Sequence, residues 1–344
     1  MVTWTLAGCG RLGFDANASS ASDASGDSVL STCAASPMLG IDLSSVGSTV
    51  QDVAVARQPD GYAIGFLMDA TSGLWGMHLD PQLVPTTKMP YHTTPVGAGG
   101  YTKASMSWTG TTLVGSVENP GNTIYLKTFA ADMTTFSTAS QRNGFHGEPS
   151  VASTASVAIS TWFDGAKLFF TDLLADGQPS GTDTILAAAP AQILTASAAS
   201  GSGAMRVAFG TADGACLIGF VTSSFDHGSS PLATTCVNPH LIAVDGQWVV
   251  AYQHGAVVVT RTVTMAATGP EVVIGPGKDP RLFTGRAGEV LVAFRDGPAL
   301  QIARAATGER LAMPGLPATV DAYETTESTV FVTAGTSAYA GGCP

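Results

Sequence analysis

Charge is scarce in this chain, and positive charge most of all. Only 12% of the 344 residues are charged, and 15 Lys and Arg face 26 Asp and Glu, which gives a net charge of −11. No segment is rich in Lys or Arg, so the surface should repel a phosphate backbone. We therefore expect no nucleic acid among the partners of this protein.

Long apolar runs and helical periodicity are missing as well. No run of eighteen apolar residues occurs, so the sequence predicts no transmembrane helix. The Ala-rich segment Ala187–Ala199 contains Pro190 and several Thr and Ser residues, which favours loop and strand over helix. These absences indicate an all-β protein.

Recognisable motifs for chemistry are also lacking. The six histidines form no HxH, HExxH or HxxxH pattern, and the acidic residues form no calcium-binding loop. There is no Gly-x-Ser-x-Gly nucleophile motif. We therefore predict no catalytic residues, no metal site and no cofactor.

What the chain does have is a β-rich segment that recurs seven times and ends in a small residue. The small residues are separated by 50, 45, 48, 43, 42 and 40 positions, and they are Gly65, Gly115, Ser160, Ala208, Ala251, Ala293 and Thr333. A period of about 40–50 residues is the length of one four-stranded propeller blade. Six Asp-Gly dipeptides indicate hairpin turns between the strands. We predict a β-propeller with seven blades, with six or eight as the alternatives.

The seventh repeat, Thr319–Ala340, is too short for four strands. We expect Met38–Leu43 to supply the missing outer strand and so to close the ring, which also removes open sheet edges. Tandem β-sandwiches and a β-solenoid are the competing architectures. Sandwiches need about 100 residues each and show no such period, and the coils of a solenoid are far shorter.

The N-terminal segment Leu6-Ala7-Gly8-Cys9 resembles the lipobox of bacterial lipoproteins. The resemblance implies cleavage before Cys9, lipidation of its thiol and a membrane anchor. Only eight residues precede Cys9, without a basic or a fully apolar region, so we expect the true start to lie upstream. A chance thiol in a disordered leader is the alternative.

Residues 10–32 include the small and polar stretch Ala16–Asp27, so we expect a disordered tether (10–32) between the lipobox segment (1–9) and a propeller domain (33–344). Gly10, which follows Cys9 in place of Asp, implies the outer membrane or cell surface as the location.

Four cysteines remain after Cys9, an even number that suits an oxidising compartment. Three pairings are possible, and we favour Cys33–Cys343, which would join the two ends of the propeller, and Cys216–Cys236, which closes a short loop. Four free buried thiols are the alternative.

Several repeats open with a polar residue, a proline and an apolar residue, as in Glu148-Pro149-Ser150-Val151 and Asp279-Pro280-Arg281-Leu282. Together with the period, this pattern resembles sialidase-like and related lipoprotein propellers. The Ser-x-Asp-x-Gly-x-Thr-Trp box of sialidases does not occur in the chain.

In a propeller, the innermost strand of each blade starts near the mouth of the channel, so polar residues there would face a ligand. The candidate ligand-binding residues are Asp52, Lys103, Glu148, His240, Asp279, Arg281 and Asp321. The alternative is that these side chains only solvate the channel and cap the strand starts.

The sequence thus favours a lipid-anchored, monomeric cell-envelope protein that binds a protein or glycan, or acts as a scaffold, without catalysis. The alternative is a glycan-directed hydrolase. That alternative requires at least three charged side chains to converge within one channel mouth, and the sialidase type requires an arginine cluster.

Overall fold

The computed structural model describes residues 33–43, 50–67, 74–86, 91–93, 103–119, 123–143, 146–153, 158–181, 183–201, 204–285, 287–326 and 328–343. The chain divides into two units, residues 1–30 and 31–344. All described residues belong to the second unit, whereas the lipobox residues, Cys9 and the expected tether lie outside the described residues.

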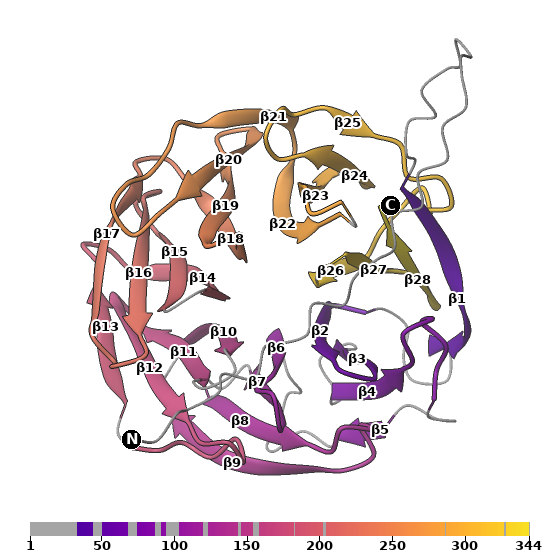
Figure 1. Cartoon of the computed structure of the whole chain (residues 1–344), viewed down its shortest axis with the longest axis horizontal. Helices are drawn as coiled ribbons and strands as arrows, with labels where there is room; N and C mark the ends of the chain where they lie inside the picture. The colour runs from indigo at the N-terminus through magenta and orange to yellow at the C-terminus, as the bar shows by residue number, and fades with distance from the viewer. Residues whose placement is uncertain are drawn as a thin grey trace, which may run out of the picture. The chain divides into compact units, whose positions relative to one another are not determined.

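The described residues form seven four-stranded antiparallel sheets arranged in a ring, as Figure 1 shows. The seven-bladed propeller predicted from the repeat is therefore confirmed. No α-helix occurs in the described ranges. It follows that none of these residues forms a helix able to cross a membrane.

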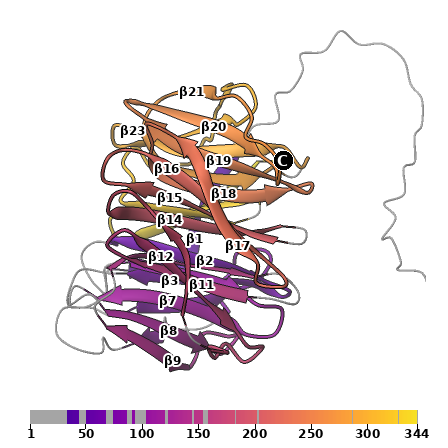
Figure 2. The ribbon, with the colours of Figure 1, turned by 90° about the vertical axis from the view of Figure 1, so that its left-hand side faces the viewer.

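From the channel outwards, blade one comprises β2 (Asp52–Gln58), β3 (Gly61–Leu67), β4 (Leu74–Leu79) and β5 (Tyr91–Thr93). Blade two comprises β6 (Lys103–Trp108), β7 (Leu113–Asn119), β8 (Thr123–Phe129) and β9 (Phe136–Asn143). Blade three comprises β10 (His146–Ser153), β11 (Ala158–Asp164), β12 (Lys167–Leu173) and β13 (Thr184–Ala188). Figure 2 shows the propeller from the side.

Blade four comprises β14 (Ile193–Gly201), β15 (Ala204–Thr211), β16 (Cys216–Thr222) and β17 (His227–Ala233). Blade five comprises β18 (Val237–Val244), β19 (Gln247–His254), β20 (Val257–Val263) and β21 (Val272–Pro276). Blade six comprises β22 (Lys278–Thr284), β23 (Val290–Asp296), β24 (Ala299–Arg304) and β25 (Arg310–Leu311). All seven small residues that marked the repeat lie in the second strand of their blade, which explains their common period.

Blade seven is built from both ends of the propeller. It contains β26 (Ala322–Thr326), β27 (Thr329–Ala334) and β28 (Ser337–Gly342), and its outer strand is β1 (Ala34–Asp42). β1 runs antiparallel to β28, with Ala34 opposite Gly342 and Ser36 opposite Ala340. The predicted closure by an N-terminal strand is confirmed, and the strand starts four residues before the predicted Met38.

The sequence specifies the hairpins through their turns. All six Asp-Gly dipeptides lie at turns between neighbouring strands of one blade. At the turn that joins β11 to β12, for example, Gly165 has φ of 55°, and Gly297 has φ of 63° between β23 and β24. Only glycine adopts such values without steric cost, so these dipeptides fix where each strand ends.

The core is divided among the seams between blades. The described buried apolar residues fall into seven clusters, one for each pair of neighbouring blades. The cluster between blades six and seven includes Cys33 and Cys343, which form a disulfide, and Cys216 forms a second disulfide with Cys236. These are the two pairs that the sequence analysis favoured.

Candidate functional site

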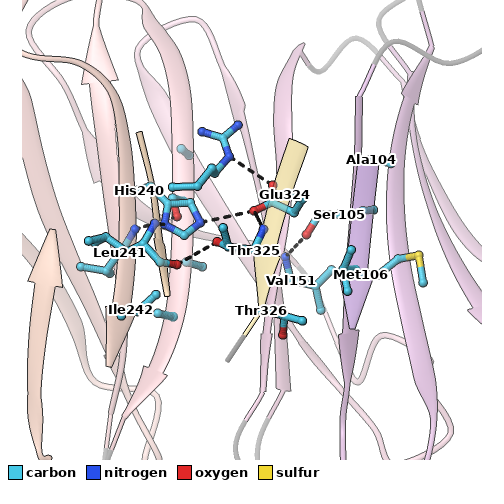
Figure 3. A pocket seen from close by; sticks show the side chains of 18 of the residues that line it. Ala104, Ser105, Met106, Val151, His240, Leu241, Ile242, Glu324, Thr325 and Thr326 are labelled. Carbon is cyan, nitrogen blue, oxygen red and sulfur yellow. Dashed lines mark hydrogen bonds and ion pairs between the residues drawn. The ribbon is translucent and has the colours of Figure 1, made fainter. Parts of the chain in front are cut away.

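A cavity of about 320 Å³ lies in the central channel, lined by the innermost strands of all seven blades. Figure 3 shows part of its wall. Five ionisable side chains line it, each from a different blade: Asp52, Lys103, His240, Arg281 and Glu324. The antiparallel hairpins of each blade present the inner strand to the channel, and each inner strand contributes between one and five residues to the cavity wall.

Side chains of the inner strands accept hydrogen bonds from the backbone of the next blade. The carboxylate Oδ2 of Asp52 accepts the N–H of Ala104 at 3.1 Å. Three other inner-strand side chains accept a backbone N–H in the same way. The Ser105 hydroxyl accepts that of Val151 (3.1 Å), the Ser197 hydroxyl that of Leu241 (3.1 Å) and Nδ1 of His240 that of Leu282 (3.0 Å). These bonds join neighbouring inner strands around the channel, so the cavity wall is pre-organised.

His240, Arg281 and Glu324 form a connected group on one side of the cavity, as Figure 3 shows in part. The Nε of Arg281 donates to Oε2 of Glu324 at 3.1 Å, and Oε1 of Glu324 lies 3.8 Å from Nε2 of His240. Because Nδ1 of His240 accepts the N–H of Leu282, a neutral ring carries its proton on Nε2, facing Glu324. Burial holds the pKa of His240 well below its usual value, and the positive charge of the nearby Arg281 lowers it further. The ring is therefore neutral at pH 7.

Asp52 is a carboxyl group of the site whose pKa is raised toward neutrality. Burial raises its pKa to about 6, against the opposing charge of Lys103 and the hydrogen bond from Ala104. Near neutral pH the cavity thus holds an ionised Asp52 and a neutral His240 ring beside Lys103, Arg281 and Glu324. Such a set offers both donors and acceptors, and it suits a small polar ligand of low net charge.

Blade four contributes the space for such a ligand. Its inner strand lines the cavity with Ala196, Ser197, Ala198 and Ala199, and none of these side chains reaches far into the channel. The large polar side chains come from blades five, six, seven, one and two instead. The cavity is therefore asymmetric, with small residues on one wall and ionisable groups opposite.

The structure brings four of the seven predicted ligand-binding residues together at this cavity: Asp52, Lys103, His240 and Arg281. Asp279 and Asp321 serve other contacts. The carboxylate of Asp279 accepts from Nδ2 of Asn238 at 2.6 Å, and its carbonyl accepts the Tyr323 hydroxyl. Asp321 precedes β26, and its carboxylate accepts the N–H of Gly335 at 2.6 Å. Glu148 lies in β10, but its side chain lies outside the described part of the chain.

The sequence did not predict Glu324, Ser105 or Ser197 as residues of the site. Glu324 lies three residues after Asp321, inside β26, where the alternation of the strand turns its side chain toward the channel. Ser105 and Ser197 are two among many serines, and nothing in the sequence distinguishes them from the others. No group of three or more His, Cys, Asp or Glu side chains in the described ranges is arranged to hold a metal ion.

Comparisons with known proteins show the fold. The sequence matches no protein-family model and no curated protein. Among solved structures, the chain is similar to the β-propeller domain of Cps50 (Swd1) from Myceliophteria thermophila, with 12% identity and a TM-score of 0.56 over 87% of this chain and 97% of that one. It is also similar to streptogramin B lyase (12% identity, TM-score 0.57, 91% and 97% covered) and to the Dos1 propeller (8%, 0.57, 90% and 95%).

Proposed function

We propose that this chain is a lipid-anchored cell-envelope protein that binds a small polar ligand, or a polar group of a glycan or protein, in its propeller channel without catalysing a reaction. The observation that carries the proposal is the convergence of five ionisable side chains from five blades on one cavity. A rigid propeller is compatible with a binding or scaffold role. The anchor is argued from the Leu6-Ala7-Gly8-Cys9 motif alone.

Pre-organisation supports binding at this position. The side chains of Asp52 and His240 are held by bonds to neighbouring blades, and Arg281 and Glu324 hold each other. A ligand that meets fixed donors and acceptors loses little free energy to ordering the site. If these buried polar and charged groups bound no ligand, they would contribute little to the stability of the fold.

A glycan-directed hydrolase is the second candidate, because the convergence of two carboxylates and two cations meets the minimum that such an enzyme requires. Arg281 is, however, the only arginine among the described residues that line the cavity. A sialidase-type site would bind its substrate carboxylate with several arginines. The channel therefore favours binding over this chemistry.

The test is a binding and turnover screen with the full chain. Monosaccharides, chitooligosaccharides, sialic acid and amino acids would be titrated by calorimetry, and 4-methylumbelliferyl glycosides would report hydrolysis. We expect binding of at least one polar compound, a loss of at least about tenfold in affinity for Arg281→Met, and no turnover. Arg310→Met, at a half-exposed arginine paired with Asp296 in the outer region of blade six, is the matched control and should bind normally. Turnover that Asp52→Asn or Glu324→Gln abolishes would establish the hydrolase instead.

A further inference from the structure

A second cavity, of about 550 Å³, lies at the seam where the ring closes between blades seven and one. One wall comes from β1 and β28, with Ser36, Pro37, Met38 and Ala340 among its residues. The other comes from the turn that follows β4 in blade one, Pro81–Val84. We refer to this space as the closure cavity.

At three other seams, the corresponding turn accepts a hydrogen bond from the preceding blade. The hydroxyl of Thr112 in blade two donates to the carbonyl of Ala175, in the turn after β12, at 2.6 Å. Likewise Thr260 donates to the carbonyl of Ala305 at 2.6 Å, and Arg206 donates to that of Thr264 at 3.0 Å. Pro81 is the counterpart of Ala175. Pro81 follows Asp80, whose carbonyl accepts the N–H of Leu83, and Ala175 follows Leu174, whose carbonyl accepts the N–H of Gly177.

A glycine keeps part of the closure cavity wall bare. A Cβ on Gly342 would lie 2.8 Å from the carbonyl oxygen of Ser328. Backbone packing thus excludes a side chain at this position. Since the outer strand of blade seven comes from the opposite end of the propeller chain, this seam is assembled differently from the others.

The base of the closure cavity is polar and fixed. The Tyr62 hydroxyl lies 3.3 Å from the hydroxyl of Thr329, and such a pair shares one of its two hydrogens, which leaves the second for a ligand. The Tyr62 ring is held from two sides, by the Arg57 guanidinium at 4.5 Å and by Phe331 in an edge contact at 5.5 Å. This side chain is therefore positioned before any ligand arrives.

The opposite rim is apolar and equally well ordered. Oδ1 of Asp80 accepts the N–H groups of Gln82 and Val84, both at 2.9 Å, and fixes the turn. Leu83, with φ of 67°, packs against the core of the seam, while Val84 is 54% exposed. No charged side chain occurs among the described residues that line the cavity.

We propose that the closure cavity is a second binding site, for an uncharged small molecule that is apolar on one side and carries one group that hydrogen-bonds to the Tyr62–Thr329 hydroxyl pair. The volume lies within the range of ligand pockets, about 300–1,000 Å³. An ion is disfavoured because it would lose water and meet no opposite charge. This site is separate from the channel and does not depend on the function proposed for it.

The experiment is a titration of the isotope-labelled full chain with acetanilide, followed by amide NMR, with benzoate and benzylammonium as charged probes of similar size. We expect acetanilide to shift the amide signals of Ser36, Met38, Leu83 and Val84 at concentrations up to about 10 mM, which detects a Kd of about 1 mM. The two charged probes should leave these signals in place.

Variants locate the effect. Val84→Asp places a charge at the exposed rim and should weaken acetanilide binding at least about fivefold, whereas Ile185→Asp, at a 44% exposed apolar residue of β13, should not. Ser36→Phe should fill the cavity and abolish the shifts, with its folding checked from the remaining spectrum. Arg281→Met in the channel should have no effect. Equal shifts with benzoate, or no shifts at these four amides, would overturn the proposal, whatever the channel binds.

Discussion

The Nδ1 atom of His240 in blade five accepts the backbone N–H of Leu282 in blade six at 3.0 Å. This bond spans 42 residues of sequence and joins two inner strands that share no sheet. The imidazole thus has two functions in our account. It holds the channel wall together, and it presents Nε2 to the cavity beside Glu324.

Replacement of His240 tests the first function. In His240→Ala the buried N–H of Leu282 loses its acceptor, which should reduce the free energy of unfolding by about 1–3 kcal/mol. His240→Asn keeps an acceptor at a similar distance from the backbone and should recover part of the loss. Urea unfolding followed by tryptophan fluorescence measures both. If Ala and Asn cost the same, the hydrogen bond contributes nothing to stability.

The raised pKa of Asp52, about 6, predicts that its charge destabilises the folded protein at neutral pH. The folded state retains the proton up to about pH 6, while an unfolded aspartate loses it near its ordinary value, so the free energy of unfolding should fall as pH rises through this window. Asp52→Asn should therefore be more stable than the parent protein at pH 7.5, by about 1–2 kcal/mol, because the partly exposed carboxyl retains some solvent.

The difference should vanish at pH 4, where Asp52 is protonated in the folded protein. Asp164→Asn serves as the control, since Asn-Gly supports the same hairpin turn as Asp-Gly. A stabilisation that is equal at pH 4 and pH 7.5 would contradict the role of the carboxyl charge.

The two disulfides should contribute unequally to stability. Cys33 and Cys343 are 310 residues apart and join the closing strand to the end of the ring, whereas Cys216 and Cys236 are 20 residues apart. In the chain-entropy description, the first crosslink stabilises by about 6 kcal/mol and the second by about 3 kcal/mol. Thermal unfolding of the Cys33→Ser/Cys343→Ser and Cys216→Ser/Cys236→Ser double variants should show the larger loss for the first. The reverse order would argue that the strand pairing of β1 with β28 closes the ring unaided.

The proposed anchor depends on one thiol. Expressed in a bacterium behind a full signal sequence, the protein should carry a diacylglyceryl group on Cys9, visible as added mass on the N-terminal peptide. Cys9→Ser should release the protein from the membrane fraction. Gly10→Asp should move it from the outer to the inner membrane. An unmodified Cys9 would leave the channel proposal intact and remove the membrane from our account.

The fold was largely predictable because each blade is encoded locally. The small residues of the second strands recur in every repeat and Asp-Gly turns in five of the seven blades, so the period alone indicates the architecture. Even the closing strand was predictable, since Thr319–Ala340 is too short for a blade. Its start at Ala34 was not, because the pairing with Gly342 is a contact between chain ends that no local pattern specifies.

The site was only partly predictable, for the same physical reason. The side chains that face the cavity depend on register, and irregular pairing shifts that register, as between Val237 and His240 or between Lys278 and Arg281. A position that looks like a strand start, such as Asp321, then lies in the preceding turn, while Glu324 reaches the channel. Contacts between blades more than 40 residues apart decide which polar residues meet.

Hydrogen exchange of the full chain, with and without a polar compound that the binding screen identifies, tests the channel proposal most directly. We expect the bound compound to slow exchange at the inner strands, with the amides of Ala104, Leu282 and Thr325 affected first, and to leave the outer strands β9, β13, β17 and β21 unchanged. Protection confined to the outer strands, with inner-strand exchange unaltered, would contradict the assignment of the ligand to the channel.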